Sequence, residues 1–379
     1  QVGISSTQFG PSASRPVIRG LDGDRIRVLQ NSLGTSDASS QSFDHAIPSD
    51  TLTLDSIEIV RGPMSLLYGS SAVGGVINLV TNRIPKNYSE GYASSFLAQY
   101  ESVNPGLTSA VSADFGKDKF VFHIDGSSRN LENVQTPGMV LKNSFNQQDS
   151  FSTGVTKFFD KGRVGVSYNH FNTFYGTVAE EDVTIKMDQE RFELHGDYEL
   201  DGSLFSKINL KHAQSNYIHN EIEDGSIATT FENKGYESRV EFLNNKKDLN
   251  GISGFQAQGS IFSAQGDEAF LPTSNSTKLA AFTFQEKNIG KDLINMGLRL
   301  ETSRVKKDTS VAFGDSVEKD FTLYNGSVGY SHMVSSNTTI GTNISYTERN
   351  ANFQELFANG AHIATATFEN GDSDLEKEK

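Results

Sequence analysis

The sequence contains no cysteine, no tryptophan and no long apolar run. The lack of cysteine excludes disulfides, thiolate metal sites and thiol catalysis. No apolar stretch approaches the roughly 18 residues that a membrane-spanning helix needs, which excludes a helical membrane protein. A membrane β-barrel is not excluded, because its strands alternate apolar and polar residues and average out as polar.

The chain also has few basic residues for its length. It carries 33 Lys and Arg against 47 Asp and Glu, a formal net charge of -14. This balance argues against nucleic acid as a partner and favours cations. No signal peptide is visible and the sequence starts at Gln1, so we expect a mature product or a piece of one.

From about Tyr88 onward, the sequence alternates with period two. Phe122 and Ile124 fall on one face of such a segment, and His123 and Asp125 fall on the other. About thirteen segments follow this pattern, each near or above the roughly ten residues of a membrane-spanning strand, and helical periodicity is nearly absent. The pattern predicts a transmembrane antiparallel β-barrel in contact with outer-membrane lipid.

The connections between these segments alternate in length. Short polar turns are predicted at 116–119, 160–163, 201–203, 245–251, 288–292 and 335–337. Longer connections are predicted at 130–146, 175–182, 218–233, 264–276, 305–320 and after Arg349. This alternation is typical of outer-membrane barrels, which have tight periplasmic turns and long extracellular loops.

Thirteen is an odd number of strands, whereas single-chain bacterial barrels have an even number. The sequence ends at "LEKEK" with no closing apolar strand. An open barrel leaves an unpaired edge in lipid, where each unsatisfied peptide group costs several kcal/mol. We therefore expect the barrel to be truncated at its C-terminus and the chain to be truncated at its N-terminus as well.

Residues 1–85 read as a separate α+β domain, followed by the barrel at 86–379. Short β-like runs surround "LDGD", and a strand is predicted from Ile57 to Val60. Gly62-Pro63 ends this strand pattern, and a helical turn is predicted after it. A glycine-rich stretch then leads into a strand from Val76 to Val80.

Three motifs make the chain resemble a family. "RPVIRGLDGDRIRVL", "DSIEIVRGPMSLLYGSSAVGGVINLVTN" and "TERNANFQELFANGAHIATATFENGDSDLEKEK" are similar to segments of TonB-dependent outer-membrane receptors. The resemblance implies a plug domain inside a 22-stranded barrel, of which only about 13 strands are present. It also implies active import driven by the TonB-ExbB-ExbD complex. The energy-coupling box of the family would lie upstream of Gln1.

Within that family, the chain most resembles the zinc-uptake receptors, through "FDHAIPSD", "YIHNEIEDG" and "ANGAHIATATFENG". The resemblance implies that Zn²⁺ is the transported substrate and not a catalytic cofactor. Carried over by motif, the zinc ligands are Asp44, His45, Glu221 and His362, with His219 as an additional or relay ligand.

One departure concerns residues 174–185. The zinc receptors carry a His-rich, Cys-containing insertion in an external loop, and here "YGTVAEEDVTIKM" takes its place. Its acidic residues are Glu180, Glu181 and Asp182. The departure weakens the case for a zinc-capturing loop but leaves the central site unaffected.

The residues also point to a cation site without the family. The loop alternation places His219, Glu221 and His362 in external loops, and a plug that fills the lumen brings Asp44 and His45 to the same vestibule. Imidazole and carboxylate ligands of this number suit zinc. Copper or nickel would bind such a set as tightly or more tightly, so the identity of the metal stays open.

The leading hypothesis is therefore import of zinc or a zinc complex, bound between the plug apex and the extracellular loops. An alternative is a haem or metal-chelate receptor of the same fold, with His45 and His362 as axial ligands. An adhesin or phage receptor is a third possibility, although it would need no convergent ligands. No nucleophile elbow or other placed catalytic motif is present, so an enzyme is not predicted.

Overall fold

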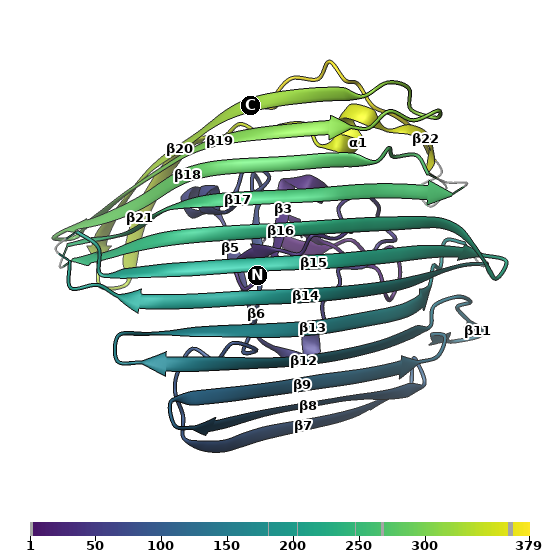
Figure 1. The fold of residues 1–379 in the computed structure, drawn as a ribbon, viewed down its shortest axis with the longest axis horizontal. Helices are drawn as coiled ribbons and strands as arrows, with labels where there is room; N and C mark the ends of the chain where they lie inside the picture. The colour runs from purple at the N-terminus through teal and green to yellow at the C-terminus, as the bar shows by residue number, and fades with distance from the viewer. Residues whose placement is uncertain (1–2, 181, 203, 247, 267–268, 363–366) are drawn as a thin grey trace.

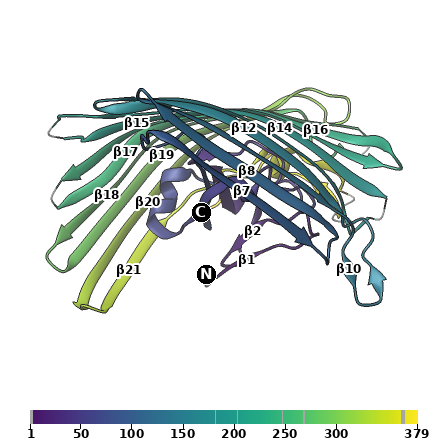
Figure 2. The same ribbon diagram turned by 90° about the horizontal axis from the view of Figure 1, so that it is seen from below.

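The computed structural model describes residues 3–180, 182–202, 204–246, 248–266, 269–362 and 367–379. One large sheet curves around an N-terminal domain (Figure 1). Seen from below, the sheet arches over that domain and covers one side of it (Figure 2). Among the described residues, no helix is both long and apolar enough to cross a lipid bilayer.

The large sheet has thirteen antiparallel strands, and each strand pairs with its neighbours in chain order from β7 to β21. This confirms the predicted number of strands and the antiparallel barrel, which is a partial one with β7 and β21 as its edges. The strands are β7 (Gly91–Glu101), β8 (Gly106–Lys117), β9 (Phe120–Leu131), β12 (Asn146–Phe159), β13 (Gly162–Gly176), β14 (Val183–Glu199), β15 (Lys207–Glu223), β16 (Ser226–Lys246), β17 (Leu249–Gly266), β18 (Ser274–Ile289), β19 (Asp292–Lys307), β20 (Val317–Ser335) and β21 (Thr338–Tyr346).

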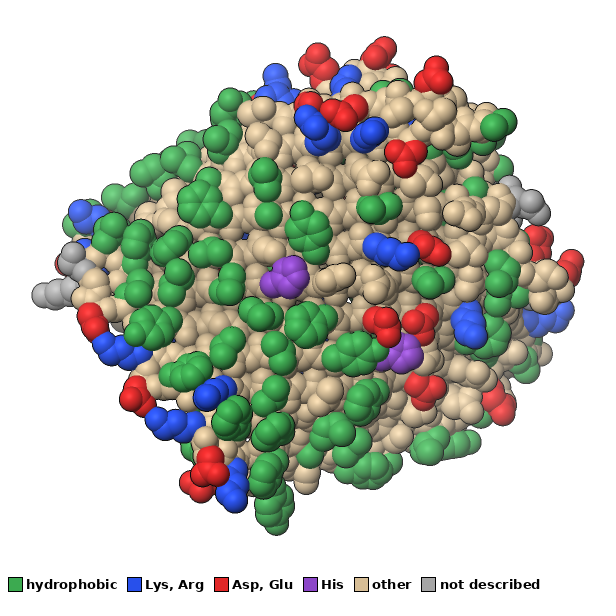
Figure 3. Space-filling model, in the orientation of Figure 1, with side chains coloured by type: hydrophobic (Ala, Val, Ile, Leu, Met, Phe, Trp, Pro, Cys, Tyr) green, Lys and Arg blue, Asp and Glu red, His purple; other side chains and the backbone are tan. Residues whose placement is uncertain are grey.

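The two faces of the sheet differ as the alternation predicts. Phe122 is 51% exposed on the outer face, whereas Asp125 is 2% exposed on the inner one. Apolar side chains are spread over the outer face in Figure 3, and charged groups gather toward its margins. An apolar exterior and a polar interior are what a barrel in lipid requires.

Connection lengths follow the predicted alternation with one exception. The segment 218–233 was predicted as a long loop, and this prediction is wrong. Strand β15 continues to Glu223 and β16 begins at Ser226, so only Asp224 and Gly225 connect them. Both have positive φ, 48° and 76°, as the common two-residue hairpin turn requires. The Asp-Gly pair is a strong signal for such a turn, and the inward-facing strand positions around it carry the polar residues His219, Glu221, Thr229 and Asn233.

Two of the other segments at the same end of the sheet contain short elements. A small hairpin, β10 (Gln135–Thr136) and β11 (Met139–Val140), precedes β12. After β21 come helix α1 (Phe353–Phe357) and a hairpin of β22 (Asn359–His362) and β23 (Thr367–Asn370). Asn352 and Glu355 form a capping box at the start of α1, which fixes this short helix. We call this the long-loop end of the sheet, and the opposite end the short-turn end.

The N-terminal domain is built on a four-stranded sheet in the order β4-β3-β6-β5. In it β3 and β6 run parallel and the other pairs are antiparallel. Ile18, Ile26, Ile77 and Leu79 form its core. The elements are β1 (Ile4–Ser6), β2 (Pro16–Ile18), η1 (Gly23–Arg25), β3 (Ile26–Gln30), β4 (Leu33–Gly34), η2 (Thr51–Thr53), β5 (Leu54–Val60), η3 (Gly62–Tyr68) and β6 (Gly75–Thr81).

Buried arginines of the large sheet hold this domain in place. Arg239 and Arg299 both donate to the backbone carbonyl of Leu67 in η3, at 2.9 and 3.4 Å. Arg191 donates to the carbonyl of Gly34. Each of the three arginines pairs with the glutamate two residues later on the same face of its strand: Glu193, Glu241 and Glu301. The pairing neutralises the buried charges, so the guanidinium groups can anchor the domain through its backbone.

Candidate metal centre

Three side chains with metal-ligating atoms converge at the contact between the N-terminal domain and the large sheet. They are His45 from the segment before η2, and His219 and Glu221 from β15. One ligating atom from each lies within 4.8 Å of the others, and all three residues are buried. His219 and Glu221 are two residues apart on one strand, so both point to the inner face, toward His45.

The second nitrogen of each imidazole is already engaged. His45 Nδ1 donates to the carbonyl of Ala38 at 3.0 Å, and His219 Nδ1 is 3.0 Å from the Tyr217 hydroxyl. This leaves both Nε2 atoms directed toward the cluster. His219 Nε2 is buried and has no hydrogen-bond partner among the described residues. Fixing one ring nitrogen so that the other faces a metal is the usual arrangement of histidine ligands.

His45 and Glu221 hold each other directly, with His45 Nε2 3.1 Å from Glu221 Oε1. Burial by itself lowers the pKa of His45, but the nearby carboxylates of Asp44 and Glu221 outweigh burial and raise it to about 9. The proton on Nε2 thus neutralises the excess of carboxylate around it. A metal ion would take the place of that proton, since imidazole ligands bind in the neutral form.

The backbone around His45 is fixed by a barrel residue. The hydroxyl of Tyr175 on β13 donates to the Asp44 carbonyl at 2.7 Å and accepts from the Ala46 amide at 3.0 Å. The imidazole packs edge-on against the rings of His219 and Phe231. These contacts set the position of the His45 ring without using its Nε2.

Asp44 and His362 both form a hydrogen bond with the hydroxyl of one serine, Ser42, next to the cluster. Asp44 Oδ2 is 3.8 Å from His45 Nε2, while its Oδ1 accepts from the Ser42 hydroxyl. His362 Nε2 is 2.7 Å from that same hydroxyl. On the other side, His362 Nδ1 is 2.6 Å from Glu369 on β23. His362 is therefore linked to Asp44, beside the cluster, through Ser42.

Next to the cluster lies a very small cavity of about 10 Å³, which we call the upper cavity; of the three clustered residues, only Glu221 lines it. This is the space of about one water molecule or one ion. Asp44, Glu221 and His362 line it, together with the acidic residues Glu180 and Glu223. Burial raises the pKa of Glu180, and the neighbouring carboxylates raise it further. Such a concentration of carboxylates creates a strong local demand for a cation.

The five predicted site residues thus lie together at one position. His45, His219 and Glu221 form the tight cluster, Asp44 borders it, and His362 closes it from the β22–β23 hairpin. His219, predicted as an additional ligand, lies inside the cluster. His219 and Glu221 reach it from a strand and not from the predicted loop.

Sequence reasoning missed three contributors. Ser42 and Glu369 each make a hydrogen bond to His362, and nothing in their local sequence signals that role. Glu180 was treated as part of an acidic loop, and its position at the cavity depends on the path of that loop. Its neighbour Glu181, in the same predicted acidic run, lies outside the described residues.

Two family models match the chain and together cover most of it. The TonB-dependent receptor plug domain matches residues 1–76, and the TonB-dependent receptor-like β-barrel matches residues 85–379. The chain belongs to the TonB-dependent receptor family. The N-terminal domain is therefore its plug, and the chain is an outer-membrane protein of a receptor family, not an enzyme.

Curated relatives match short segments. The iron-regulated outer membrane virulence protein of Vibrio cholerae is 46% identical over 46 residues, 12% of this chain and 7% of that protein. A probable TonB-dependent siderophore receptor PirA of Acinetobacter baumannii is 31% identical over 83 residues, 21% of this chain and 11% of that protein.

Solved structures share the fold at low sequence identity. The copper transporter OprC has a TM-score of 0.84 and 16% identity, covering 99% of this chain and 62% of that one. The Serratia marcescens hemophore receptor HasR has a TM-score of 0.76 and 12% identity, covering 100% of this chain and 64% of that one. The chain spans less than two thirds of the length of these structures.

Proposed function

We propose that the chain is the substrate-binding part of an outer-membrane receptor that imports zinc, either as the ion or as a small complex. The single observation that supports this most is the convergence of His45, His219 and Glu221 within 4.8 Å, with both Nε2 atoms facing the cluster. Two imidazoles and a carboxylate form a ligand set suited to zinc, and Asp44 is close enough to complete four-coordination after a small shift.

The size of the upper cavity favours an ion over a haem or a large chelate. A space of about 10 Å³ accepts one atom-sized ligand. His362, the ligand needed for the haem alternative, is held between Glu369 and Ser42 and stacks on Phe270 with ring centroids 4.4 Å apart. Copper would also fit the ligand set, because nitrogen and oxygen ligands do not select zinc over Cu²⁺.

In the proposed cycle, the long-loop end faces the outside of the cell, as in outer-membrane barrels generally. The cation binds between the plug apex and the β15–β16 hairpin, and the β22–β23 hairpin closes over it. The TonB-ExbB-ExbD complex, as the proposed periplasmic partner, then acts on the plug to open a path.

Isothermal titration calorimetry of the full-length receptor with Zn²⁺ tests the proposal. We expect binding to a single site, and His219→Ala should abolish the heat. His170→Ala is the matched control, because His170 also contacts a carboxylate, Asp188, but on the outer face. The proposal is rejected if the unmutated receptor gives no zinc-dependent heat, or if His219→Ala binds as the wild type does.

A metal-edge anomalous scattering experiment on crystals grown with an equimolar mixture of Zn²⁺ and Cu²⁺ would identify the preferred ion. A zinc peak between His45 and His219 supports the proposal as stated. A copper peak at the same place would keep the site and change the substrate.

A further inference from the structure

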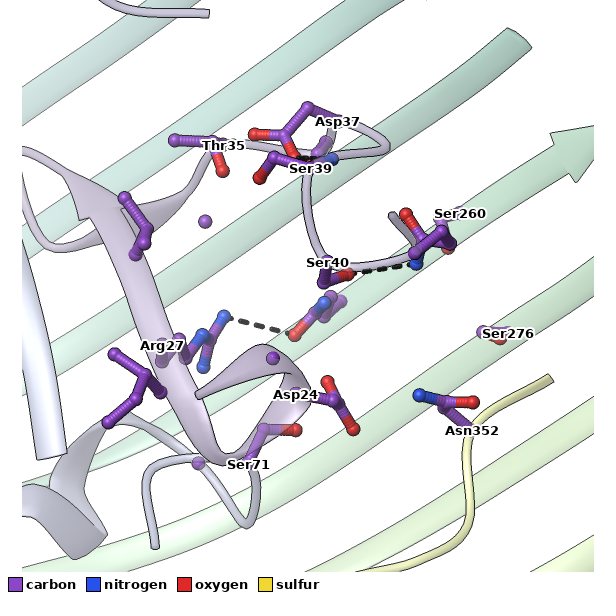
Figure 4. Close-up of a pocket in the computed structure, with 18 of the residues that line it drawn as sticks. Asp24, Arg27, Thr35, Asp37, Ser39, Ser40, Ser71, Ser260, Ser276 and Asn352 are labelled. Carbon is purple, nitrogen blue, oxygen red and sulfur yellow. Dashed lines mark hydrogen bonds between the residues drawn. The ribbon is translucent and has the colours of Figure 1, made fainter. Parts of the chain in front are cut away.

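A second and larger cavity lies between the plug and the barrel wall, and we call it the lower cavity. Its volume is about 190 Å³. Figure 4 shows plug residues on one side of it, Asp37, Ser39 and Ser40 among them, and the wall residues Ser260 and Ser276 on the other. Nothing in the proposed metal centre uses this space, and hydroxyl and amide groups dominate the polar part of its lining.

Small residues in register produce the cavity. Gly235 on β16 pairs with Ser260 on β17, and Ser260 pairs with Ser276 on β18. Three adjacent strands therefore present no large side chain toward the plug at the same height. A Cβ at Gly235 would lie 2.7 Å from the Ser36 hydroxyl oxygen, so the plug loop approaches the wall closely at that point. The recess is a consequence of these short side chains.

The lower cavity lies one step below the metal centre along β16. Phe231 lines the upper cavity and Asn233, the next inward-facing residue, lines the lower one. Two residues along a strand advance about 7 Å. Asn233 is opposite Tyr217, the residue that holds His219, and its Nδ2 donates to the Asp37 carbonyl at 3.0 Å. The lower cavity thus follows the metal centre in the direction of the short-turn end.

Unpaired oxygen atoms distinguish this lining. Four of its residues have a buried side-chain oxygen with no hydrogen-bond partner among those the structure describes: Asp37 Oδ2, Gln41 Oε1, Asn233 Oδ1 and Asn350 Oδ1. Three of them, Gln41, Asn233 and Asn350, are more than nine-tenths buried. All four atoms are acceptors, so they need donors, and the water shell of a cation supplies donors in every direction.

The charges that border the lower cavity are mostly compensated. Arg27 pairs with Glu237, Lys278 lies 3.9 Å from Glu301, and Asp24 pairs with Arg349. The remaining charged lining residues are Arg15 and Asp37, one of each sign. The lining as a whole is therefore neutral, and among the residues that the structure describes, Asp37 is the one lining carboxylate that forms no salt bridge.

A third cavity on the other side of the plug has the opposite character. It lies between plug strand β6 and strands β13 to β15, and its volume is about 300 Å³. Its lining has two carboxylates, Glu58 and Asp197, against four basic side chains: Lys86, Arg163, Lys207 and Lys211. An excess of positive charge repels a cation from this side. Of these two cavities beside the plug, the lower cavity is the one whose lining does not repel a divalent cation.

We propose that the lower cavity is a second holding site for the imported cation, which it accepts with its water shell after the cation leaves the upper cavity. This inference rests on the proposed function. The cation passes along the β16–β19 wall, with Asp37 as the charged contact and the amide and hydroxyl oxygens as contacts to its waters. The site is wide and hydrated, so it binds weakly and releases readily, unlike the metal centre above it.

Zinc uptake by cells and zinc binding by the purified full-length receptor, measured on the same variants, test this. Asp37→Asn keeps the shape and the contact with the Ser39 amide. We expect this variant to take up zinc about tenfold more slowly, which is the smallest loss usually seen when an outer-shell group of a metal site is removed. Its zinc affinity at the metal centre, measured by calorimetry, should be unchanged. Glu58→Gln, the matched control in the basic cavity, should change neither. Normal uptake by Asp37→Asn overturns the inference and leaves the proposed function standing. Absence of zinc binding and uptake in the wild type overturns both.

The absence of cysteine allows a second, direct test. Ser260→Cys places a thiol in the lower cavity, and Asn209→Cys places one in the basic cavity. We expect a positively charged methanethiosulfonate to react faster than a negatively charged one at Ser260→Cys, and millimolar Zn²⁺ to slow this reaction. The charge preference should be reversed at Asn209→Cys. Equal rates at both positions, with no effect of zinc, would show a cavity that holds water only and would overturn the inference.

Discussion

His362 Nε2 lies 2.7 Å from the hydroxyl of Ser42, although the two residues are 320 positions apart in the chain. Ser42 in turn donates to Asp44, so one hydroxyl joins a barrel hairpin to the plug apex. The contact is buried, and the stacking of His362 on Phe270 orients the imidazole toward it. The position of the β22–β23 hairpin and the position of Asp44 are therefore coupled through a single side chain.

Replacing Ser42 with alanine should weaken zinc binding even though Ser42 is not a proposed ligand. We expect a loss of about tenfold in affinity, because Asp44 and His362 would each lose a partner that orients them. Calorimetry with Zn²⁺ measures the effect. Ser95→Ala, which removes an exposed hydroxyl bonded to Ser112 on the edge pair β7–β8, is the control, and equal affinities for the two variants would contradict the coupling.

The orientation of His219 gives a second prediction. Tyr217→Phe removes only the hydroxyl that holds His219 Nδ1. The zinc affinity should fall by about 10- to 100-fold, as is usual when an outer-shell partner of a histidine ligand is removed. Tyr168→Phe removes a hydroxyl bonded to Glu190 on the outer face and should leave the affinity unchanged. An unaffected Tyr217→Phe variant would mean that His219 is oriented by packing alone.

The buried arginine–glutamate pairs that anchor the plug lead to a prediction about stability. Glu301→Ala leaves the Arg299 guanidinium buried without its main partner, 2.5 Å away in the wild type. Breaking a buried pair in this way costs about 3–5 kcal/mol. We expect faster proteolysis of the plug and a lower urea midpoint. In the control Glu318→Ala, only the exposed pair with Arg304 is lost, and an exposed pair of this kind contributes little to stability. Similar effects in both variants would contradict an anchoring role.

Acid should loosen the region around α1. Burial by itself raises the pKa of Glu355, but hydrogen bonds from Arg349 and from the Asn352 amide lower it below its ordinary value of 4.5. A lowered pKa in the folded state stabilises the fold above the ordinary value, and this contribution disappears as the pH falls through the folded value. Hydrogen exchange of α1 measured from pH 7 to pH 3, after correction for the intrinsic rate, should show falling protection at the acid end. Glu355→Gln should flatten this dependence, and an unchanged profile would contradict the assignment.

The sequence predicts the barrel well because its signal is local and repeated. Each strand shows its own alternation, as Phe122 and Asp125 do, and the turn residues mark most of the boundaries. The segment 218–233 was misread for the same reason. Polar residues on an inward-facing strand look like loop residues when the plug that buries them is not considered, and the Asp224-Gly225 signal was given too little weight.

The sequence was enough to predict the residue types of the candidate site, but not the hydrogen bonds that link them. Adjacent Asp44 and His45, and His219 spaced two residues from Glu221, are visible in the sequence. The links through Ser42 and Glu369 depend on where the β22–β23 hairpin meets the plug, and no local pattern encodes that meeting. The lower cavity could not be predicted either, because it depends on the register of three strands. Only that register places Gly235, Ser260 and Ser276 side by side.

The two-residue turn at Asp224 and Gly225 has a mechanical consequence. It makes His219 and Glu221 part of a rigid hairpin, whereas His45 belongs to the plug, on which the proposed energy source acts. A displacement of the plug by even a few ångströms would split the ligand set between two bodies, leaving two ligands on the wall and withdrawing the third. Release of a tightly held ion would then need no competing ligand, because separation of the two domains would dismantle its coordination sphere.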